Sequence, residues 1–294
     1  MQTGLAGRTV IVTGGNANIG RGIAHAFAAE NAKVAIVARD AAQGRRVVDE
    51  LVARGARDAL WHAADVTSRP EVDAMVDAVR ARLGDIDVLV NNVGGNVAVD
   101  AFVDSDPKTW DQDIALNFKS ALNCTHAVLP GMIERSRGRI LHIGSTAGLV
   151  GDPLLSVYSA LKGAIHAFTR VLAKEVGRHG ITVNAIAPYG TMPEDPENAF
   201  SSGSRFHRDG VISRTLATRP QEMARIARRT VLERQLALPS EIGAAAVYLA
   251  SPAGRKINGV ILYLDAGLQI ADDAGMVYLP GRSRPPYEQR IEGI

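Results

Sequence analysis

Tyr158 and Lys162 stand four residues apart in the segment YSALKGA (158–164). On a helix, side chains at positions i and i+4 share one face. A tyrosine with an ordinary pKa of about 10 is a poor base at neutral pH, but a nearby ammonium group favours the phenolate and lowers that pKa. The pair could therefore transfer protons, or it could be a chance pair on a helix surface. The decision depends on whether a nucleotide site lies elsewhere in the chain.

A glycine-rich segment, VTGGNANIGRGIA (12–24), follows a short apolar run and opens a helical pattern. The first turn of a helix carries free N–H groups and a positive partial charge, so it can bind a pyrophosphate. We expect Gly14 and Gly20 to permit a tight turn and a close approach of the backbone, and Gly22 to let the helix pack near the sheet. The alternative is an ordinary loop between a strand and a helix.

Short apolar runs rich in Val and Ile alternate with longer segments of helical period. They predict strands at 8–13, 33–38, 58–63, 87–91, 139–144, 181–187 and 259–265, and helices near 20–30, 41–54, 70–83, 107–135, 156–178 and 240–250. Strands that are apolar throughout are buried on both faces, as in a parallel sheet. The alternation therefore predicts an α/β fold: a doubly wound, mostly parallel Rossmann-type sheet with helices on both faces, in a single domain over residues 1–270.

Two segments interrupt this alternation. Nearly 50 residues separate APYG (187–190) from the helix after Pro239, which is far longer than a usual connection. The tail over residues 271–294 is rich in proline and charge, and we expect it to be extended.

Composition excludes several classes of function. The chain has 294 residues, is 46% hydrophobic and carries a formal charge of only +2, so nothing in its charge predicts a nucleic-acid or membrane partner. Its one cysteine, Cys124, excludes an intramolecular disulfide and is interpreted as a small buried hydrophobe. The seven histidines lack metal-ligand spacing, and Ile143 replaces the first glycine of a GxSxG hydrolase motif around Ser145. Without a signal peptide or a membrane span, we expect a cytoplasmic protein.

Four motifs together are similar to those of one known family. TGGNANIG (13–20) resembles the TGxxxGxG turn of the short-chain dehydrogenase/reductase family, and NNVGG (91–95) resembles its NNAG motif. IGSTAG (143–148) resembles the serine segment after the fifth strand, and YSALK (158–162) resembles the YxxxK motif. The motifs occur in the family's order and at its spacing, so Tyr158 and Lys162 are predicted to do chemistry.

The resemblance implies a catalytic tetrad of Asn117, Ser145, Tyr158 and Lys162. Tyr158 would act as general acid and base in hydride transfer between a nicotinamide and a carbonyl or secondary alcohol. Lys162 would lower the pKa of Tyr158 and reach the nicotinamide ribose. Ser145 would hydrogen-bond the reacting oxygen, and Asn117 would hold a water that links Lys162 to solvent.

Contacts with the cofactor also follow from the resemblance. They are expected at Gly14, Asn16, Asn18, Ile19, Gly20, Arg39, Asp65, Val66, Asn91, Tyr158, Lys162, Pro188 and Thr191. Three residues depart from the family pattern. Asn18 replaces the second glycine, and asparagine tolerates a positive φ. Val93 replaces an alanine, and Tyr189 interrupts a Pro-Gly pair beside the nicotinamide, where it could contact cofactor or substrate.

The end of the second strand, VAIVARD, bears on the choice of nicotinamide nucleotide. Relatives that use NAD usually carry an acidic residue there, which binds the ribose 2′-OH. This chain has Ala38 followed by Arg39, and an arginine can pair with a 2′-phosphate. The sequence therefore favours NADP(H). NAD remains an alternative, because Asp40 would approach the ribose if the strand ended one residue later.

By resemblance, the segment over about 189–238 is an extended substrate lid. Its part from Ser201 to Gln235 holds eight arginines and no lysine, against three acidic residues. Some of these arginines could bind an anionic substrate, or they could form a solvated surface. The family also suggests a homotetramer or dimer through the helices at 107–135 and 156–178. The remaining rivals are an NAD-dependent alcohol dehydrogenase that works in the oxidative direction and a non-catalytic nucleotide-sensing protein.

Overall fold

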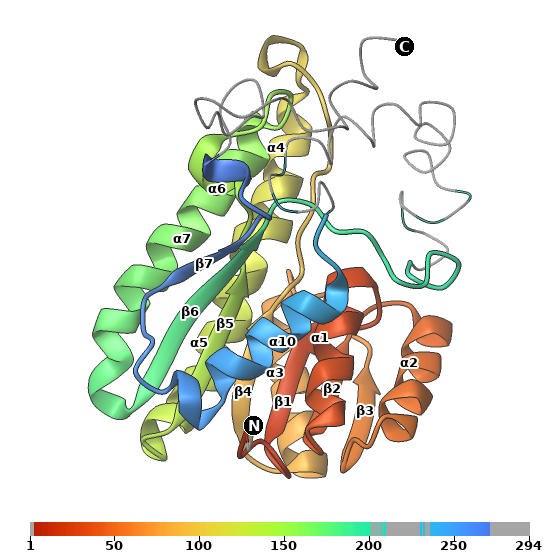
Figure 1. Cartoon of the computed structure of the whole chain (residues 1–294), viewed down its shortest axis with the longest axis vertical. Helices are drawn as coiled ribbons and strands as arrows, with labels where there is room; N and C mark the ends of the chain where they lie inside the picture. The colour runs from red at the N-terminus through yellow and green to blue at the C-terminus, as the bar shows by residue number, and fades with distance from the viewer. Residues whose placement is uncertain are drawn as a thin grey trace, which may run out of the picture.

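A computed structural model describes residues 3–200, 204, 207, 209, 230, 232 and 236–270 (Figure 1). Its centre is a seven-stranded sheet in which every neighbouring pair is parallel, in the order β3-β2-β1-β4-β5-β6-β7. The strands are β1 Thr9–Thr13, β2 Lys33–Val37, β3 Asp58–His62, β4 Ile86–Asn91, β5 Gly138–Ile143, β6 Ile181–Pro188 and β7 Ile261–Leu264. The doubly wound α/β fold predicted from the sequence is confirmed.

The described helices form two layers, one on each face of the sheet. They are α1 Asn18–Ala29, α2 Ala41–Ala53, α3 Arg69–Leu83, α4 Pro107–Ile114, α5 Ser120–Glu134, α6 Ala147–Val150, α7 Ser156–Val176 and α10 Pro239–Ala250. Helices α1, α2 and α10 cover one face (Figure 1), and α3, α5 and α7 cover the other. Between α4 and α5, residues Ala115–Lys119 form a π-helical turn.

Alternate residues of one strand belong to different cores. Val10 and Val12 of β1 pack with Ile23 and Phe27 of α1, whereas Ile11 points into the core that contains Met75 of α3. All of these residues are fully buried. Burial on both faces explains why the strand segments read as continuous apolar runs.

One expectation about α1 was wrong. A Cβ added at Gly22 would lie 2.4 Å from the Pro239 Cβ, and one added at Gly243 would lie 2.7 Å from the Gly22 carbonyl oxygen. Gly22 therefore permits close packing of α1 on α10, and not of α1 on the sheet.

Parallel strands place all their carboxyl ends on one edge of the sheet. The chain runs from β1 outward to β2 and β3, then returns to β4 on the other side of β1, so the strand order reverses beside β1. In open α/β sheets, ligands bind at the carboxyl edge at such a reversal. The predicted catalytic and cofactor residues lie at or after the ends of β1 to β6, so the topology gathers them on this edge.

Candidate active site

The glycine-rich turn joins β1 to α1 and presents bare backbone. Gly14 has φ +64°, and a Cβ there would lie 2.9 Å from Asn92 Nδ2. A Cβ on Gly20 would lie 2.2 Å from the Gly14 carbonyl oxygen. Asn18 occupies the position of the second glycine with φ +37°, as its tolerance of the left-handed region predicts. This glycine-lined cradle at a helix N-terminus fits the pyrophosphate of a dinucleotide.

The motif after β4 holds this turn in place. Asn92 Nδ2 donates to the Thr13 carbonyl at 2.9 Å, and Thr13 Oγ1 accepts from the backbone N–H groups of Asn92 and Val93 at 3.0 and 3.2 Å. The Asn91 side chain instead points between β4, β5 and α5, where its Nδ2 donates to Thr125 Oγ1 at 2.9 Å and lies 3.2 Å from His142 Nδ1. Any contact of Asn91 with an adenosine ribose is therefore left to its backbone.

Arg39 and Asp65, two of the residues expected to contact the cofactor, lie close enough together for the charge of Arg39 to act on the Asp65 carboxylate. Strand β2 ends at Val37, and the Asp40 carboxylate caps α2, where it accepts from the Gln43 N–H at 3.0 Å. Arg39 is exposed. Burial raises the pKa of Asp65, but two hydrogen bonds from Thr67 and the charge of Arg39 outweigh it, so that pKa lies below its ordinary value.

Ser145, Tyr158 and Lys162 meet just beyond the end of β5. Ser145 is hydrogen-bonded to the Tyr158 hydroxyl, and its Oγ accepts from the Ala147 N–H at 3.1 Å. Lys162 Nζ donates to the Ile143 carbonyl at 2.9 Å and lies 5.6 Å from the centroid of the Tyr158 ring. Ser145, just after β5, thus forms a compact group with Tyr158 and Lys162, which stand one turn apart on α7, as the motifs predict.

Asn117 lies at the π-helical turn, a type of local distortion that often marks functional sites. Its side chain brackets Gly95: Oδ1 accepts from the Gly95 N–H and Nδ2 donates to the Gly95 carbonyl, each at 2.9 Å. A Cβ added at Gly94 would lie 2.9 Å from Asn117 Oδ1 and 3.0 Å from Lys162 Nζ. The Gly94 backbone therefore lies between these two side chains, and the structure brings all four tetrad residues together.

The charges of the site differ from the expectation in one respect. Burial raises the pKa of Tyr158 to about 12, and the charges of Asp152 and Asp113 add to the effect of burial against the opposing Ser145 hydrogen bond. Burial also lowers the pKa of Lys162 to about 8. The expected lowering of the Tyr158 pKa by Lys162 is therefore absent from the protein alone, since burial disfavours both charged forms.

Asp113 is a site residue that the motifs did not indicate. It is 4% exposed, and its Oδ1 accepts from the Val97 N–H at 3.0 Å and from Asn117 Nδ2 at 3.3 Å. It also lines a shallow hollow that reaches Tyr158 and is bordered by Trp110. The sequence signal was available, because Asp113 stands one helical turn before Asn117.

Asp113→Asn should move the pH profile of the enzyme to lower pH. The Asp113 charge favours the neutral phenol, so its removal lowers the pKa of Tyr158 while an acceptor for Val97 remains. Asp152 and the Ser145 hydrogen bond also act on this phenol and stay unchanged. If Tyr158 exchanges the proton as the motifs predict, alcohol oxidation needs the phenolate and carbonyl reduction needs the phenol, so both limbs of the profile should shift downward together. The measurement is kcat/KM against pH; Asp100→Asn, in the same hollow, is the control, and an equal shift in both variants contradicts the assignment.

The other predicted cofactor residues border the same edge. Ile19 lies in the first turn of α1, and Val66 follows β3 and is 3% exposed. The Pro188 carbonyl accepts from the Thr146 N–H at 3.1 Å, which joins β6 to the serine segment, and Thr191 pairs with Ala237. Most of the arginine-rich segment over 201–235 and the whole 271–294 tail lie outside the described residues.

Other chemistries find no support in the part of the chain that the structure describes. There, no group of three or more His, Cys, Asp or Glu side chains could hold a metal ion, and no helix could cross a membrane. Burial raises the pKa of the Cys124 thiol to about 12, so the thiol stays protonated at neutral pH, in accord with its predicted role as a buried apolar residue.

This combination of fold and site defines a nicotinamide-dependent oxidoreductase, and similarity to known proteins agrees. The family model of the short chain dehydrogenases matches residues 8–200. The chain is 35% identical to a D-beta-hydroxybutyrate dehydrogenase of Cupriavidus necator, over 90% of this chain and 98% of that protein. It is 31% identical to 2-(S)-hydroxypropyl-CoM dehydrogenase 3 of Xanthobacter autotrophicus, over 91% and 99%.

Two further relatives extend the comparison. The chain is 30% identical to the 3-oxoacyl-[acyl-carrier-protein] reductase FabG of Vibrio cholerae, over 90% of this chain and 98% of that protein. The crystal structure of gox2181 superposes with a TM-score of 0.78 at 28% identity, over 90% of this chain and 97% of that one. The chain belongs to the short-chain dehydrogenase/reductase family.

Proposed function

We propose that this enzyme interconverts a carbonyl compound and a secondary alcohol with NADP(H), and that Tyr158 transfers the proton. The observation that carries the proposal is the group of Ser145, Tyr158 and Lys162 at the carboxyl edge of the sheet that holds the glycine-lined cradle. An oxygen that reacts at this point meets two hydroxyl donors. A protein that only senses nucleotide has no need for them.

The nicotinamide supplies or accepts the hydride when it is bound, and the protein positions the reacting groups and moves the proton. In reduction, the Tyr158 hydroxyl donates its proton to the oxygen of the carbonyl group, and Ser145 donates a hydrogen bond to the same oxygen. In oxidation, Tyr158 takes the proton back. Lys162, whose pKa of about 8 lies near neutral pH, can pass a proton between Tyr158 and a water held by Asn117.

The proposed preference for NADP(H) is supported by the layout of the adenosine end. Asp40 is engaged as the cap of α2, and Arg39 is the exposed residue that follows Ala38. Arg39→Ala should raise KM for NADPH about tenfold and leave KM for NADH unchanged. A tenfold change is what the loss of one charge-assisted hydrogen bond at an exposed site would cause. The measurement is KM for both nucleotides. A wild-type preference for NADH would support the NAD-dependent oxidative alternative.

The substrates in the relatives' names support a first choice of substrate. A hydroxybutyrate with its hydroxyl at the β carbon and a 3-oxoacyl group carry oxygen at the same carbon. We propose a 3-oxo or 3-hydroxy acyl compound for this enzyme. Acetoacetate and its neutral ethyl ester test the proposal at saturating NADPH. If the enzyme turns over neither compound, the proposal is overturned. A preference for acetoacetate that disappears at high salt would support an anionic substrate bound by arginines of the lid.

The family also supports a homotetramer or dimer in the cytoplasm. Ile114 on α4 and Val171 on α7 are 43% and 52% exposed, and both belong to the helices expected at the contact. Sedimentation as a stable monomer would overturn the proposed assembly.

A further inference from the structure

The segment after β6 runs back across the carboxyl edge of the sheet. It leaves the strand beside Pro188, pairs with Ala237 at Thr191, and ends at Asn198 and Ala199 against helices α1 and α2. Figure 1 shows this segment passing from the top of β6, above α10 and α1, toward the end of α2. We call residues 192–200 the strap.

The far end of the strap is held at one carbonyl group. The Asn198 carbonyl oxygen accepts from Arg21 at 3.0 Å, from Gln43 Nε2 at 3.0 Å and from Arg46 at 2.8 Å. Arg46 also donates to Asn198 Oδ1 at 2.6 Å. Three side chains from two helices thus fix a single residue of the strap.

Two hydrogen bonds join the strap to the glycine-rich turn. The Gln43 amide that binds the strap also donates to the Asn16 carbonyl at 3.0 Å. The Ala199 carbonyl accepts from the Asn18 N–H at 2.8 Å, and Ala199 is 2% exposed. Because Gln43 is 8% exposed and bonded to both segments, a displacement of the strap breaks a partly buried hydrogen bond beside the cradle.

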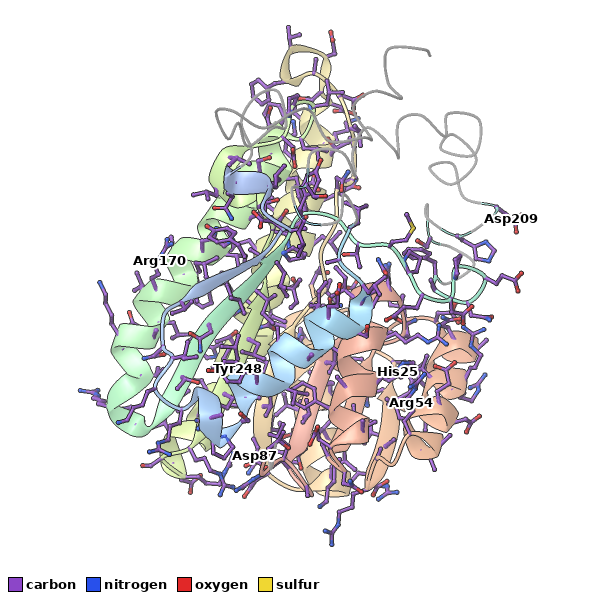
Figure 2. The ribbon with its side chains drawn as sticks, viewed as in Figure 1. His25, Arg54, Asp87, Arg170, Asp209 and Tyr248 are labelled. Atoms are coloured by element: carbon purple, nitrogen blue, oxygen red, sulfur yellow. The ribbon has the colours of Figure 1, made fainter. Side chains whose placement is uncertain are left out.

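The arginine from α1 is itself held in place. Glu50 of α2 accepts from two nitrogens of Arg21 at 2.7 and 2.8 Å and lies 2.9 Å from His25 Nε2. This ion pair joins α1 to α2. Figure 2 labels His25 on α1 and Arg54 at the end of α2. Glu50 therefore holds Arg21 independently of the strap, which limits the side-chain entropy lost in binding the Asn198 carbonyl.

We propose that Gln43 and Arg46 are positioning residues of the cofactor site, which hold the strap against the glycine-rich turn and thereby slow dissociation of the dinucleotide. The inference rests on the proposed function in one respect, that a dinucleotide binds along this edge. Such a ligand reaches from the glycine-rich turn to Lys162 and Pro188, and the strap connects the same two ends. The bound dinucleotide leaves after Asn198 of the strap detaches from Gln43 and Arg46, so these anchoring bonds contribute to the barrier to dissociation.

The experiment compares Arg46→Met and Gln43→Leu with Arg45→Met. Arg45 is the neighbouring arginine on α2, and its guanidinium lies over the Trp61 ring and not on the strap. The dissociation rate of NADPH is measured by stopped-flow fluorescence with NADP⁺ as displacing ligand. Hydrogen exchange at the Asn18 amide, which the Ala199 carbonyl covers, is measured without nucleotide. The rate of hydride transfer in a single turnover is the third quantity.

We expect about a tenfold faster dissociation of NADPH in Arg46→Met and Gln43→Leu, partial recovery in Arg46→Lys, and an unchanged rate in Arg45→Met. Exchange at Asn18 should quicken in the first two variants, and the single-turnover rate should stay within about twofold of wild type. Equal dissociation rates in Arg46→Met, Arg45→Met and wild type would overturn the proposal. Failure of the wild-type enzyme to bind either nucleotide would instead overturn the proposed function.

Discussion

Tyr158→Phe should lower kcat for carbonyl reduction by about 10²-fold to 10⁴-fold, the range for loss of a general acid. The substitution removes only the hydroxyl group that Ser145 contacts, and leaves the aromatic ring beside Lys162 in place. The dissociation constant for NADPH should stay within about twofold of wild type. The measurement is steady-state kinetics together with a fluorescence titration of NADPH.

Ser145→Ala serves as the comparison for this variant. Ser145 orients the same oxygen but transfers no proton in the proposed mechanism, so its loss should cost less than that of the Tyr158 hydroxyl, about 10²-fold. Thr169→Val is the control for a buried hydroxyl on the same helix, since its Oγ1 bonds only the Ile165 carbonyl among the contacts described here. Full activity in Tyr158→Phe would exclude Tyr158 as the acid.

Gly20→Ala should weaken nucleotide binding and lower the stability of the fold. The added methyl group would lie 2.2 Å from the Gly14 carbonyl and 2.5 Å from Asn92 Nδ2, so the turn must open to admit it. Overpacking of this kind costs about 1–3 kcal/mol of stability. Because the displaced backbone is the cradle itself, the dissociation constant for NADPH should also rise at least about tenfold. Urea unfolding and an NADPH titration measure the two effects separately.

Gly22→Ala is the matched control, two residues further along α1. Its methyl group would lie 2.4 Å from the Pro239 Cβ, at the contact of α1 with α10 and away from the cradle. It should lose a similar amount of stability and keep its affinity for NADPH. If both variants lose affinity equally, the effect belongs to α1 as a whole and the cradle is not the cause.

The fold could be predicted because its inner strands are buried on both faces. Segments such as VIVT in β1 read as continuous apolar stretches, and between the strands α1, α3 and α7 show a helical period. The helix expected over 107–135 contains a π-helical turn at Ala115–Lys119. The hydrophobic periodicity does not predict such a turn, from which Asn117 reaches the Gly95 backbone.

The motif residues of the site could be predicted for a similar reason. Tyr158, Lys162 and Ser145 have fixed spacing within elements whose ends the topology brings together. The pKa of Tyr158 could not be predicted from the motifs, because it depends on burial and on Asp152 and Asp113, which belong to no motif. Contacts between distant segments also carry no local signal: neither the packing of Gly22 on Pro239 nor the anchoring of Asn198 could be read from spacing.

The most direct test follows the hydride. NADPH deuterated at C4 of the nicotinamide, with each prochiral position labelled in a separate sample, is incubated with the enzyme and with acetoacetate or ethyl acetoacetate. Mass spectrometry then measures deuterium in the alcohol product. Our account predicts that one of the two labels appears on the carbon that carried the carbonyl oxygen, and that Tyr158→Phe slows its appearance by at least about 10²-fold. Alcohol formed without label from either sample, or label transferred at the wild-type rate by Tyr158→Phe, would contradict it.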